Sequence, residues 1–213
     1  MAKSPRTKAD DADVPDNNPE VISMIPDGAM QIEDVVQLGL LNHHTHFLVG
    51  EIDDANVGRA IQWILYENNN TQHPEHLTLY MNSGGGDLYN AFALIDIILN
   101  SKIPVWTVGI GNIMSGAALI FACGARGHRY LGKHTGIMIH QFTSSIEGKE
   151  HEIAASMHEM DLCRERVNEL LVKQCKITDK TVREKLLHPS DVWMTAQEAI
   201  QYHLADKLLT SII

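Results

Sequence analysis

Cysteine is scarce in this chain, and its spacing does not suit a disulfide framework or a metal site. The 213 residues include three cysteines, Cys123, Cys163 and Cys175, and no two of them form a CxxC pair. An odd number of scattered cysteines favours a reducing compartment. We therefore expect a cytoplasmic protein that is stabilised by a hydrophobic core, for which the chain is long enough.

Basic residues and long apolar runs are scarce as well. Lys and Arg number 17 against 27 Asp and Glu, so the formal net charge is -10 at pH 7. Nucleic-acid binding requires a basic patch, and this charge argues against nucleic acid as the main partner. No apolar run approaches the roughly 20 residues of a membrane span, so no membrane anchor is expected.

The first 20 residues differ in composition from the rest. They are polar and charged, contain three prolines and lack the apolar segment of a secretory signal. This composition predicts a disordered leader over residues 1–20. The remaining residues, 21–213, are expected to form one folded domain.

Strand-like and helical patterns alternate after the leader. The expected strands are Phe47–Gly50, Leu77–Met81, Pro104–Ile110 and Gly136–His140, and the expected helices are Ala55–Asn69, Leu88–Asn100, Ser115–Cys123 and about Glu150–Cys175. Alternation of this kind predicts an α/β fold with largely parallel strands.

The last of these helices is unusually long. Apolar or uncharged residues recur along it at helical spacing, at Ile153, Met157, Met160, Val167, Leu171 and Gln174. Such a stripe can pack on the protein's own sheet. However, a helix of about 25 residues spans some 37 Å, more than a domain of this size needs. We therefore expect part of the stripe to form an interface with another subunit.

A single serine lies in a glycine-marked turn between an expected strand and an expected helix. Ser115 belongs to the segment GNIMSGAA, residues 111–118. A turn of this kind can lift a side chain out of the sheet and point backbone N–H groups at a ligand, as a nucleophilic serine requires. The alternative is an ordinary serine at a helix N-cap.

Two further residues complete a possible triad. His140 ends an expected buried strand, and Asp191 lies in a loop just before Thr195 to Glu198, which have the pattern of a helix capping box. Serine, histidine and aspartate act as nucleophile, base and orienting carboxylate in hydrolases. Taken singly, His140 could be a core histidine and Asp191 an exposed loop acid.

Several segments together resemble the proteolytic subunits of the Clp ATP-dependent protease family. The resemblance extends from about Phe47 to Leu209 and rests on FLVGEI (47–52), YMNSGGG (80–86), Ser115 in its turn, MIHQ (138–141) and EAIQY (198–202). The order serine, histidine, aspartate is also that of this family and differs from the orders of α/β-hydrolases, chymotrypsin and subtilisin. The resemblance implies a crotonase-like spiral of ββα units from which the long helix protrudes as a handle.

The same resemblance implies a function. The chain would be a serine endopeptidase subunit that hydrolyses unfolded polypeptides with Ser115, His140 and Asp191 inside a chamber of stacked homo-oligomeric rings, heptameric in the family. The backbone N–H groups of Gly85 and Gly116 would form the oxyanion hole. A separate Clp-type ATPase would unfold substrates, because the chain has no nucleotide-binding motif. No metal and no organic cofactor is expected.

Two glycines depart from the family pattern. The family commonly has proline where this chain has Gly84, and a larger residue, often methionine, where it has Gly116. Gly84 would add backbone freedom beside the oxyanion hole, and Gly116 would remove a side chain from the substrate pocket. Rate and specificity are affected by these departures, whereas the reaction type is not.

Two other functions share the expected fold. An acyl-CoA enzyme of the crotonase type would use the oxyanion glycines but has no use for the triad. A non-catalytic ring subunit would keep the fold, although such subunits usually lose triad residues.

A short run of histidines offers a further alternative. His43, His44 and His46 lack the partner pair of a zinc site, so a solvated or interface strand is favoured over a metal site.

Overall fold

The computed structural model describes residues 32–71 and 73–212. The chain divides into two compact units, residues 1–39 and 40–213. Helix α1 (Ile32–Asn42) runs across this division, and the second unit contains the whole sheet. The predicted leader, residues 1–20, lies outside the described residues.

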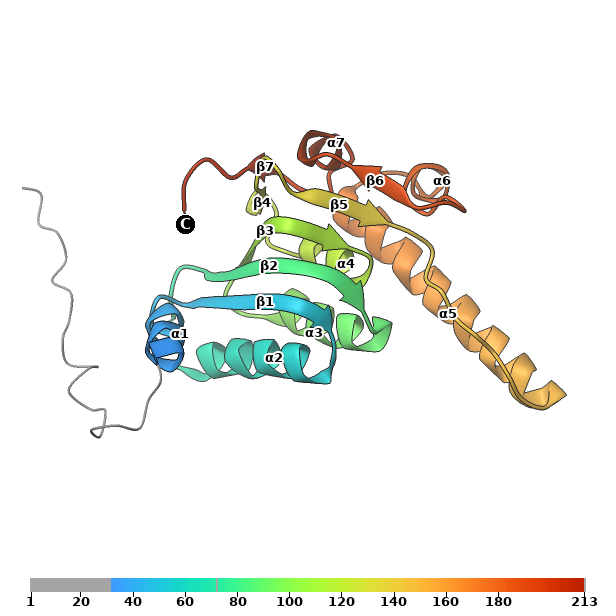
Figure 1. The fold of residues 1–213 in the computed structure, drawn as a ribbon, viewed down its shortest axis with the longest axis horizontal. Helices are drawn as coiled ribbons and strands as arrows, with labels where there is room; N and C mark the ends of the chain where they lie inside the picture. Colours follow the sequence, from blue (N-terminus) through green and yellow to red (C-terminus); the bar gives the residue numbers. More distant parts are fainter. Residues whose placement is uncertain (1–31, 72, 213) are drawn as a thin grey trace, which may run out of the picture. The chain divides into compact units, whose positions relative to one another are not determined.

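A mostly parallel sheet organises the second unit (Figure 1). Its main path runs β1-β2-β3-β4-β7, and β5 pairs with both β3 and β6. Every pair is parallel except β5–β6, so the predicted α/β fold is confirmed. The strands are β1 (Thr45–Ile52), β2 (Leu77–Gly86), β3 (Val105–Met114), β4 (Arg129–Leu131), β5 (Gly136–Ile139), β6 (Val192–Met194) and β7 (Lys207–Leu208).

The middle strand, β3, changes partner along its length. Its first half pairs with β4 through Thr107–Gly109, and its second half pairs with β5 through Asn112–Met114. The sheet therefore forks at β3. The strand end beyond the fork borders β2 on one side and β5 on the other.

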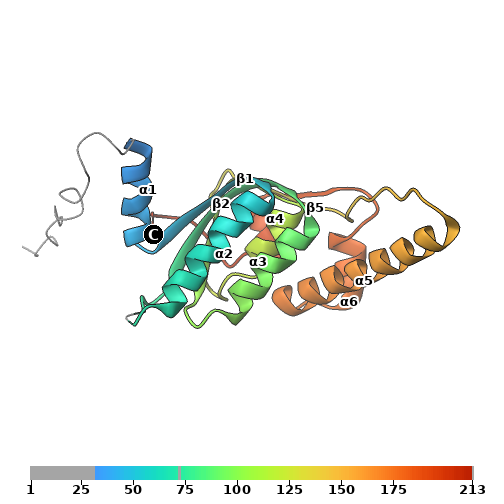
Figure 2. The same cartoon turned by 90° about the horizontal axis from the view of Figure 1, so that it is seen from below.

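Helices α2 (Asp54–Asn69), α3 (Leu88–Asn100) and α4 (Gly116–Ala122) cover one face of the sheet (Figure 2). After them come α5 (Glu150–Cys175), α6 (Asp179–Thr181) with a π-helical turn (Val182–Leu186), and α7 (Ala196–Gln201). Asp53 and Asp87 accept hydrogen bonds from the first turns of α2 and α3, so carboxylates define where both helices begin. The inward residues of β2, Leu77, Leu79 and Met81, are fully buried beneath these helices.

Helix α5 has two unlike halves. Val167, Leu171 and Gln174 in its second half are buried, whereas none of residues 150–162 is buried. Its first half projects from the body of the unit in both ribbon views (Figures 1 and 2). The predicted bounds of the helix are confirmed, and the stripe packs on the protein's own core only in the second half.

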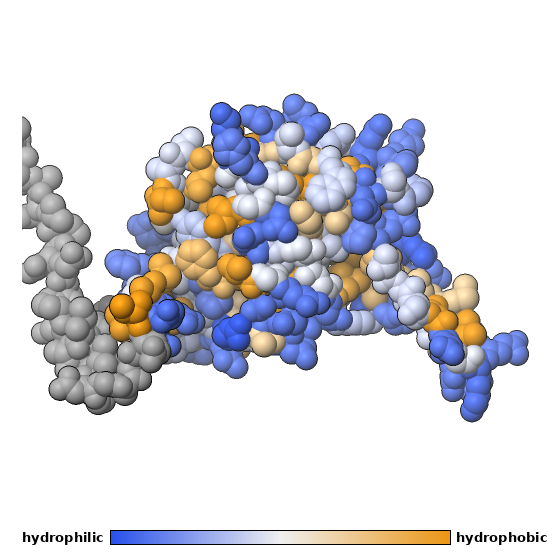
Figure 3. Space-filling view, viewed as in Figure 1, coloured by the Kyte–Doolittle hydropathy of each residue, from blue (hydrophilic) through white to orange (hydrophobic). Residues whose placement is uncertain are grey.

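Exposed hydrophobic side chains on this surface include those of β1 and of the projecting half of α5 (Figure 3). Phe47 and Val49 lie on the uncovered face of β1, where Phe47 stacks on Tyr80. On the projecting helix, Met157 is 59% exposed. Within the part of the chain that the structure describes, no helix is both long and apolar enough to cross a membrane.

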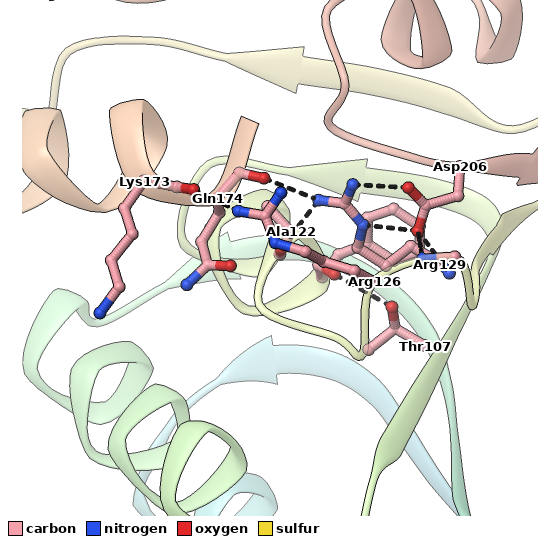
Figure 4. A network of polar contacts seen from close by, with 9 residues as sticks. Thr107, Ala122, Arg126, Arg129, Lys173, Gln174 and Asp206 are labelled. Carbon is pink, nitrogen blue, oxygen red and sulfur yellow. Dashed lines mark hydrogen bonds and ion pairs between the residues drawn. The ribbon is translucent and has the colours of Figure 1, made fainter. Parts of the chain in front are cut away.

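An arginine–aspartate network joins the end of the sheet to two helices (Figure 4). Arg129 of β4 is 2% exposed, and its Nε and Nη2 atoms donate to Asp206 over 2.8 and 2.7 Å. Asp206 also accepts the backbone N–H groups of Gly127 and Arg129. The Arg129 Nη1 atom donates to the carbonyl oxygens of Ala122 and Gln174, near the ends of α4 and α5. The network therefore satisfies helix-terminal carbonyls that would otherwise be buried without partners.

Candidate active site

Ser115 occupies the junction between β3 and α4. β3 ends at Met114 and α4 begins at Gly116, so Ser115 alone makes the turn, with φ 53° and ψ -126°. This region of backbone space is uncommon for a residue with a side chain and carries strain. The Ser115 N–H donates to the Met138 carbonyl of β5 over 2.9 Å, which holds the turn in place.

The Ser115 hydroxyl does not cap the helix that follows. Its side chain makes no capping hydrogen bond to α4. Instead, its Oγ atom lies 2.8 Å from the Nε2 atom of His140, the residue directly after β5. Ser115 therefore occupies the N-cap position of α4 without capping the helix through its side chain, and His140 contacts its hydroxyl.

Antiparallel pairing brings Asp191 to His140. Ile139 of β5 pairs with Val192 of β6, so the next residue on one strand lies opposite the preceding residue on the other. The His140 Nδ1 atom is 3.7 Å from the Asp191 Oδ1 atom, an ion-pair distance that exceeds a hydrogen bond. Asp191 is also 55% exposed. In the predicted triad, the Ser115–His140 contact is thus as short as a hydrogen bond, whereas the His140–Asp191 contact is longer.

A cavity of about 450 Å³ opens beside Ser115. It lies between the ends of β2 and β5, helices α4 and α5, and the segment before β6. Its lining residues are Gly86, Leu88, Ser115, Gly116, Leu119, Ile139, His140, Gln141, Phe142, Met160, Arg164, Val167, Arg183, Leu187 and Pro189. Apolar side chains predominate, so the cavity suits an apolar group next to a polar reacting centre.

Gly85 packs directly against Ser115 but does not line this cavity. A Cβ atom on Gly85 would lie 2.7 Å from the Ser115 Cβ atom, so the close approach requires glycine. However, the Gly85 N–H donates to the Ser83 hydroxyl over 3.1 Å and is already occupied. The neighbouring Gly86 lines the cavity, and nothing in the sequence of adjacent glycines predicts this difference from Gly85.

The histidines of the run have different surroundings, and His46 is buried rather than solvated. His46 is buried on β1 and stacks on Trp63, and burial, together with the Arg59 charge, lowers its pKa to about 4. His44 has φ 52°, precedes the strand and pairs with Glu67 over 3.0 Å. His46 therefore belongs to β1, whereas His44 lies just before the strand. Among the described residues, no three His, Cys, Asp or Glu side chains form a cluster that could hold a metal ion.

All three cysteines are free and buried. Burial raises the pKa of the Cys123 thiol to about 12 and that of Cys175 to about 11. These thiols therefore stay protonated and act as small apolar core groups. The sequence prediction that no disulfide framework holds the fold is confirmed.

The mostly parallel sheet, with a serine–histidine contact at the end of its middle strand, defines an α/β protein with a candidate hydrolytic site. The model of the Clp protease family matches residues 27–211, and the chain therefore belongs to that family.

Two curated relatives agree with this assignment. One is the ATP-dependent Clp protease proteolytic subunit 2 of Treponema denticola, 29% identical over 177 residues that make up 83% of this chain and 86% of the relative. The other is the ATP-dependent Clp protease proteolytic subunit 1 of Rhodopirellula baltica, 30% identical over 171 residues, or 80% and 74% of the two chains. Their names indicate a peptidase.

Proposed function

We propose that the chain is a serine endopeptidase subunit of an ATP-dependent Clp-type protease and that Ser115 is its nucleophile. The observation that carries this proposal is the 2.8 Å contact between the Ser115 Oγ and His140 Nε2 atoms, made by a serine in a strained turn. Strain of this kind persists where the surroundings over-determine a residue, as they do at catalytic positions.

The reaction follows from the order of the side chains. Ser115 attacks the carbonyl carbon of a peptide bond while the Nε2 atom of His140 takes the hydroxyl proton. His140 then gives this proton to the departing amine, which leaves an ester on Ser115. Water hydrolyses the ester by the same proton route in reverse. Asp191 fixes the histidine tautomer through the Nδ1 atom.

Two backbone N–H groups would hold the oxyanion. Gly116 supplies the first, because it directly follows Ser115 and borders the cavity. For the second, the predicted Gly85 would have to release the Ser83 hydroxyl. Gly86 is the better candidate, because it lines the cavity beside Ser115 and its nitrogen lies close to Gly116.

An oligomeric chamber accounts for the exposed parts of this site. None of residues 150–162 in the first half of α5 is buried, and the Asp191 side chain is about half exposed. Such exposure is expected of surfaces that a second subunit covers. Both relatives are named as subunits of an ATP-dependent protease. We therefore propose stacked homo-oligomeric rings, heptameric by resemblance, that work with a Clp-type ATPase in the cytoplasm and receive unfolded polypeptides.

A serine-directed fluorophosphonate probe tests the nucleophile. Mass spectrometry of the labelled protein should locate the adduct on Ser115, and Ser115→Ala should remove it. Absence of labelling on Ser115 in the assembled protein would overturn the proposal. Labelling also separates a peptidase from the acyl-CoA alternative, which needs no activated serine.

A second experiment tests the chamber. The protein alone should cleave a small fluorogenic peptide and spare a stable folded protein. Addition of a Clp-type ATPase with ATP should start digestion of a tagged folded substrate in a gel time course. Rapid digestion of the folded substrate by this chain alone would contradict the chamber.

A further inference from the structure

The position of the Asp191 carboxylate depends on the backbone that carries it. Among the residues that the structure describes, no hydrogen bond reaches this carboxylate, and the His140 imidazole lies 3.7 Å away. On the C-terminal side the backbone is fixed, because Val192 begins β6 and pairs with Ile139 of β5. The direction in which the carboxylate points is therefore decided by what holds the backbone on the N-terminal side.

The nearest anchored residue on that side is Leu187. Its N–H donates to the Val182 carbonyl over 2.8 Å, and its own carbonyl accepts a hydrogen bond from the Gln141 Nε2 group over 2.9 Å. Residues 188–190 follow, and in the described structure they make no backbone–backbone hydrogen bond. Side chains must therefore hold the stretch that leads to Asp191.

His188 provides this contact. Its Nδ1 atom accepts the backbone N–H of Ser190 over 3.2 Å and lies 2.8 Å from the Ser190 hydroxyl oxygen. A backbone N–H can only donate, so Nδ1 is the unprotonated ring nitrogen and the hydroxyl donates to it as well. Pro189, between the two residues, has a fixed φ angle, which narrows the conformations open to this stretch. The contact thus sets the backbone of Ser190, the residue before Asp191.

The contact lies on the surface and outside the cavity. His188 and Ser190 are both exposed, and replacement of exposed side chains usually changes stability little. Leu187 and Pro189 line the cavity beside Ser115, whereas His188 does not. A role in the core or in direct contact with a group in the cavity therefore does not account for His188.

We propose that His188 is a positioning residue for Asp191: its Nδ1 atom holds the Ser190 backbone so that the carboxylate faces His140. This inference rests on the proposed function. To orient the imidazole, the carboxylate has to close the 3.7 Å separation to a hydrogen bond. A backbone held at Ser190 restricts the carboxylate to this short movement, whereas a free backbone would let it turn into solvent.

Two substitutions of similar size test the hydrogen-bond acceptor. Leucine cannot accept a hydrogen bond, whereas the Oδ1 atom of asparagine can take the place of Nδ1. In the assembled protein, His188→Leu should lower kcat for a fluorogenic peptide by roughly three- to tenfold, the scale of one hydrogen bond, with little change in KM. His188→Asn should recover most of the lost rate. Equal kcat values for the two variants would overturn the inference.

A double-mutant cycle separates positioning of Asp191 from a general structural role. The readout is the rate at which a fluorophosphonate labels Ser115. His188→Leu should slow labelling by the same factor as kcat, but in the Asp191→Asn background it should change the rate by less than about twofold, because the carboxylate that it positions is already absent. A reduction of equal size in both backgrounds would show that His188 does not act through Asp191, which also overturns the inference.

A surface histidine elsewhere provides the matched control. His43 is exposed and lies before β1, and His43→Leu should leave kcat and the labelling rate unchanged. Size-exclusion chromatography checks that every variant assembles as the wild type does. If the probe does not label Ser115 in the wild type, the proposed function fails. If it labels Ser115 and the two His188 variants behave alike, only the role of His188 fails, so the two failures are distinguishable.

Discussion

The Arg129–Asp206 pair and the His140–Asp191 pair both join a basic side chain to an aspartate, but they are built differently. Asp206 receives two guanidinium and two backbone hydrogen bonds, and Arg129 is buried. Asp191 is exposed and lies 3.7 Å from the imidazole. The Arg129–Asp206 pair is therefore held in one arrangement by its hydrogen bonds and by the burial of Arg129. The second has room to tighten, as catalytic contacts do when substrate binds.

Removal of the nucleophile should have the largest effect. Ser115→Ala should lower kcat of peptide hydrolysis by about 10⁶-fold, as loss of the nucleophile does in subtilisin. The variant should keep the circular dichroism spectrum of the wild type. Turnover close to that of the wild type in this variant would refute Ser115 as nucleophile.

Replacement of Asp191 should have the second largest effect on activity. Asp191→Asn should reduce kcat by about 10⁴-fold, because the amide favours the wrong histidine tautomer. The matched control is Glu184→Gln, an exposed acid outside the cavity, which should retain full activity. A nearly neutral Asp191→Asn would identify Asp191 as a simple loop acid.

Loss of the Arg129–Asp206 pair should lower the stability of the protein rather than its catalytic rate. Asp206→Asn leaves the Arg129 charge buried without its partner and should lower the free energy of unfolding by about 3–5 kcal/mol. Urea denaturation measures this loss. Asp161→Asn, which breaks an exposed pair with Arg164, is the control and should have little effect. Equal losses of unfolding free energy in the two variants would contradict the expectation that the buried pair stabilises the fold more than the exposed pair.

His46 and Asp206 should lose their contributions to stability in different ranges of acidic pH. Burial lowers the pKa of His46 from 6.5 to about 4, so its contribution to stability should be lost as the pH falls from 6.5 towards 4. Burial alone would raise the pKa of Asp206, but hydrogen bonds and the charge of Arg129 outweigh it and lower that pKa. Its contribution should therefore be lost only at more acidic pH.

Measurement of the free energy of unfolding as a function of pH tests the ranges expected for His46 and for Asp206. His46→Phe should remove the slope between pH 6.5 and 4, which one proton limits to about 1.4 kcal/mol per pH unit. Asp206→Asn should leave that slope and flatten the more acidic part. If His46→Phe leaves the slope intact, His46 is not the group that titrates there.

The smallest effect concerns backbone strain. Ser115→Gly removes the side chain that makes φ 53° unfavourable, whereas Ser115→Ala keeps a Cβ atom there. The glycine variant should be more stable than the alanine variant by about 1 kcal/mol or more in urea denaturation. Both variants lack the hydroxyl, so the difference isolates the strain. Equal stabilities would mean that the turn is unstrained.

The regular elements were the predictable part of this fold. Apolar periodicity over ten or more residues predicted α2, α3 and α5, and the capping box of Thr195 and Glu198 marks the start of α7 as expected. Strands β4, β6 and β7 were not predicted, because two or three residues cannot display a period. Tertiary pairing alone holds them in place.

The site was predictable in kind but not in every contact. The turn at Ser115 and the strand end at His140 were visible in the chain, and the structure brings the two together. The choice between Gly85 and Gly86 depends on which amide faces the cavity, and adjacent glycines carry no such information. The partner of Arg129 was also hidden, because Asp206 lies 77 residues further along the chain.

Helix α5 passes the cavity where its projecting half gives way to its buried half. Met160, Arg164 and Val167 line the cavity at this crossover. One half of the helix packs in the core, whereas none of residues 150–162 is buried. A partner bound to the projecting half would therefore contact the same continuous helix that forms one wall of the cavity beside Ser115.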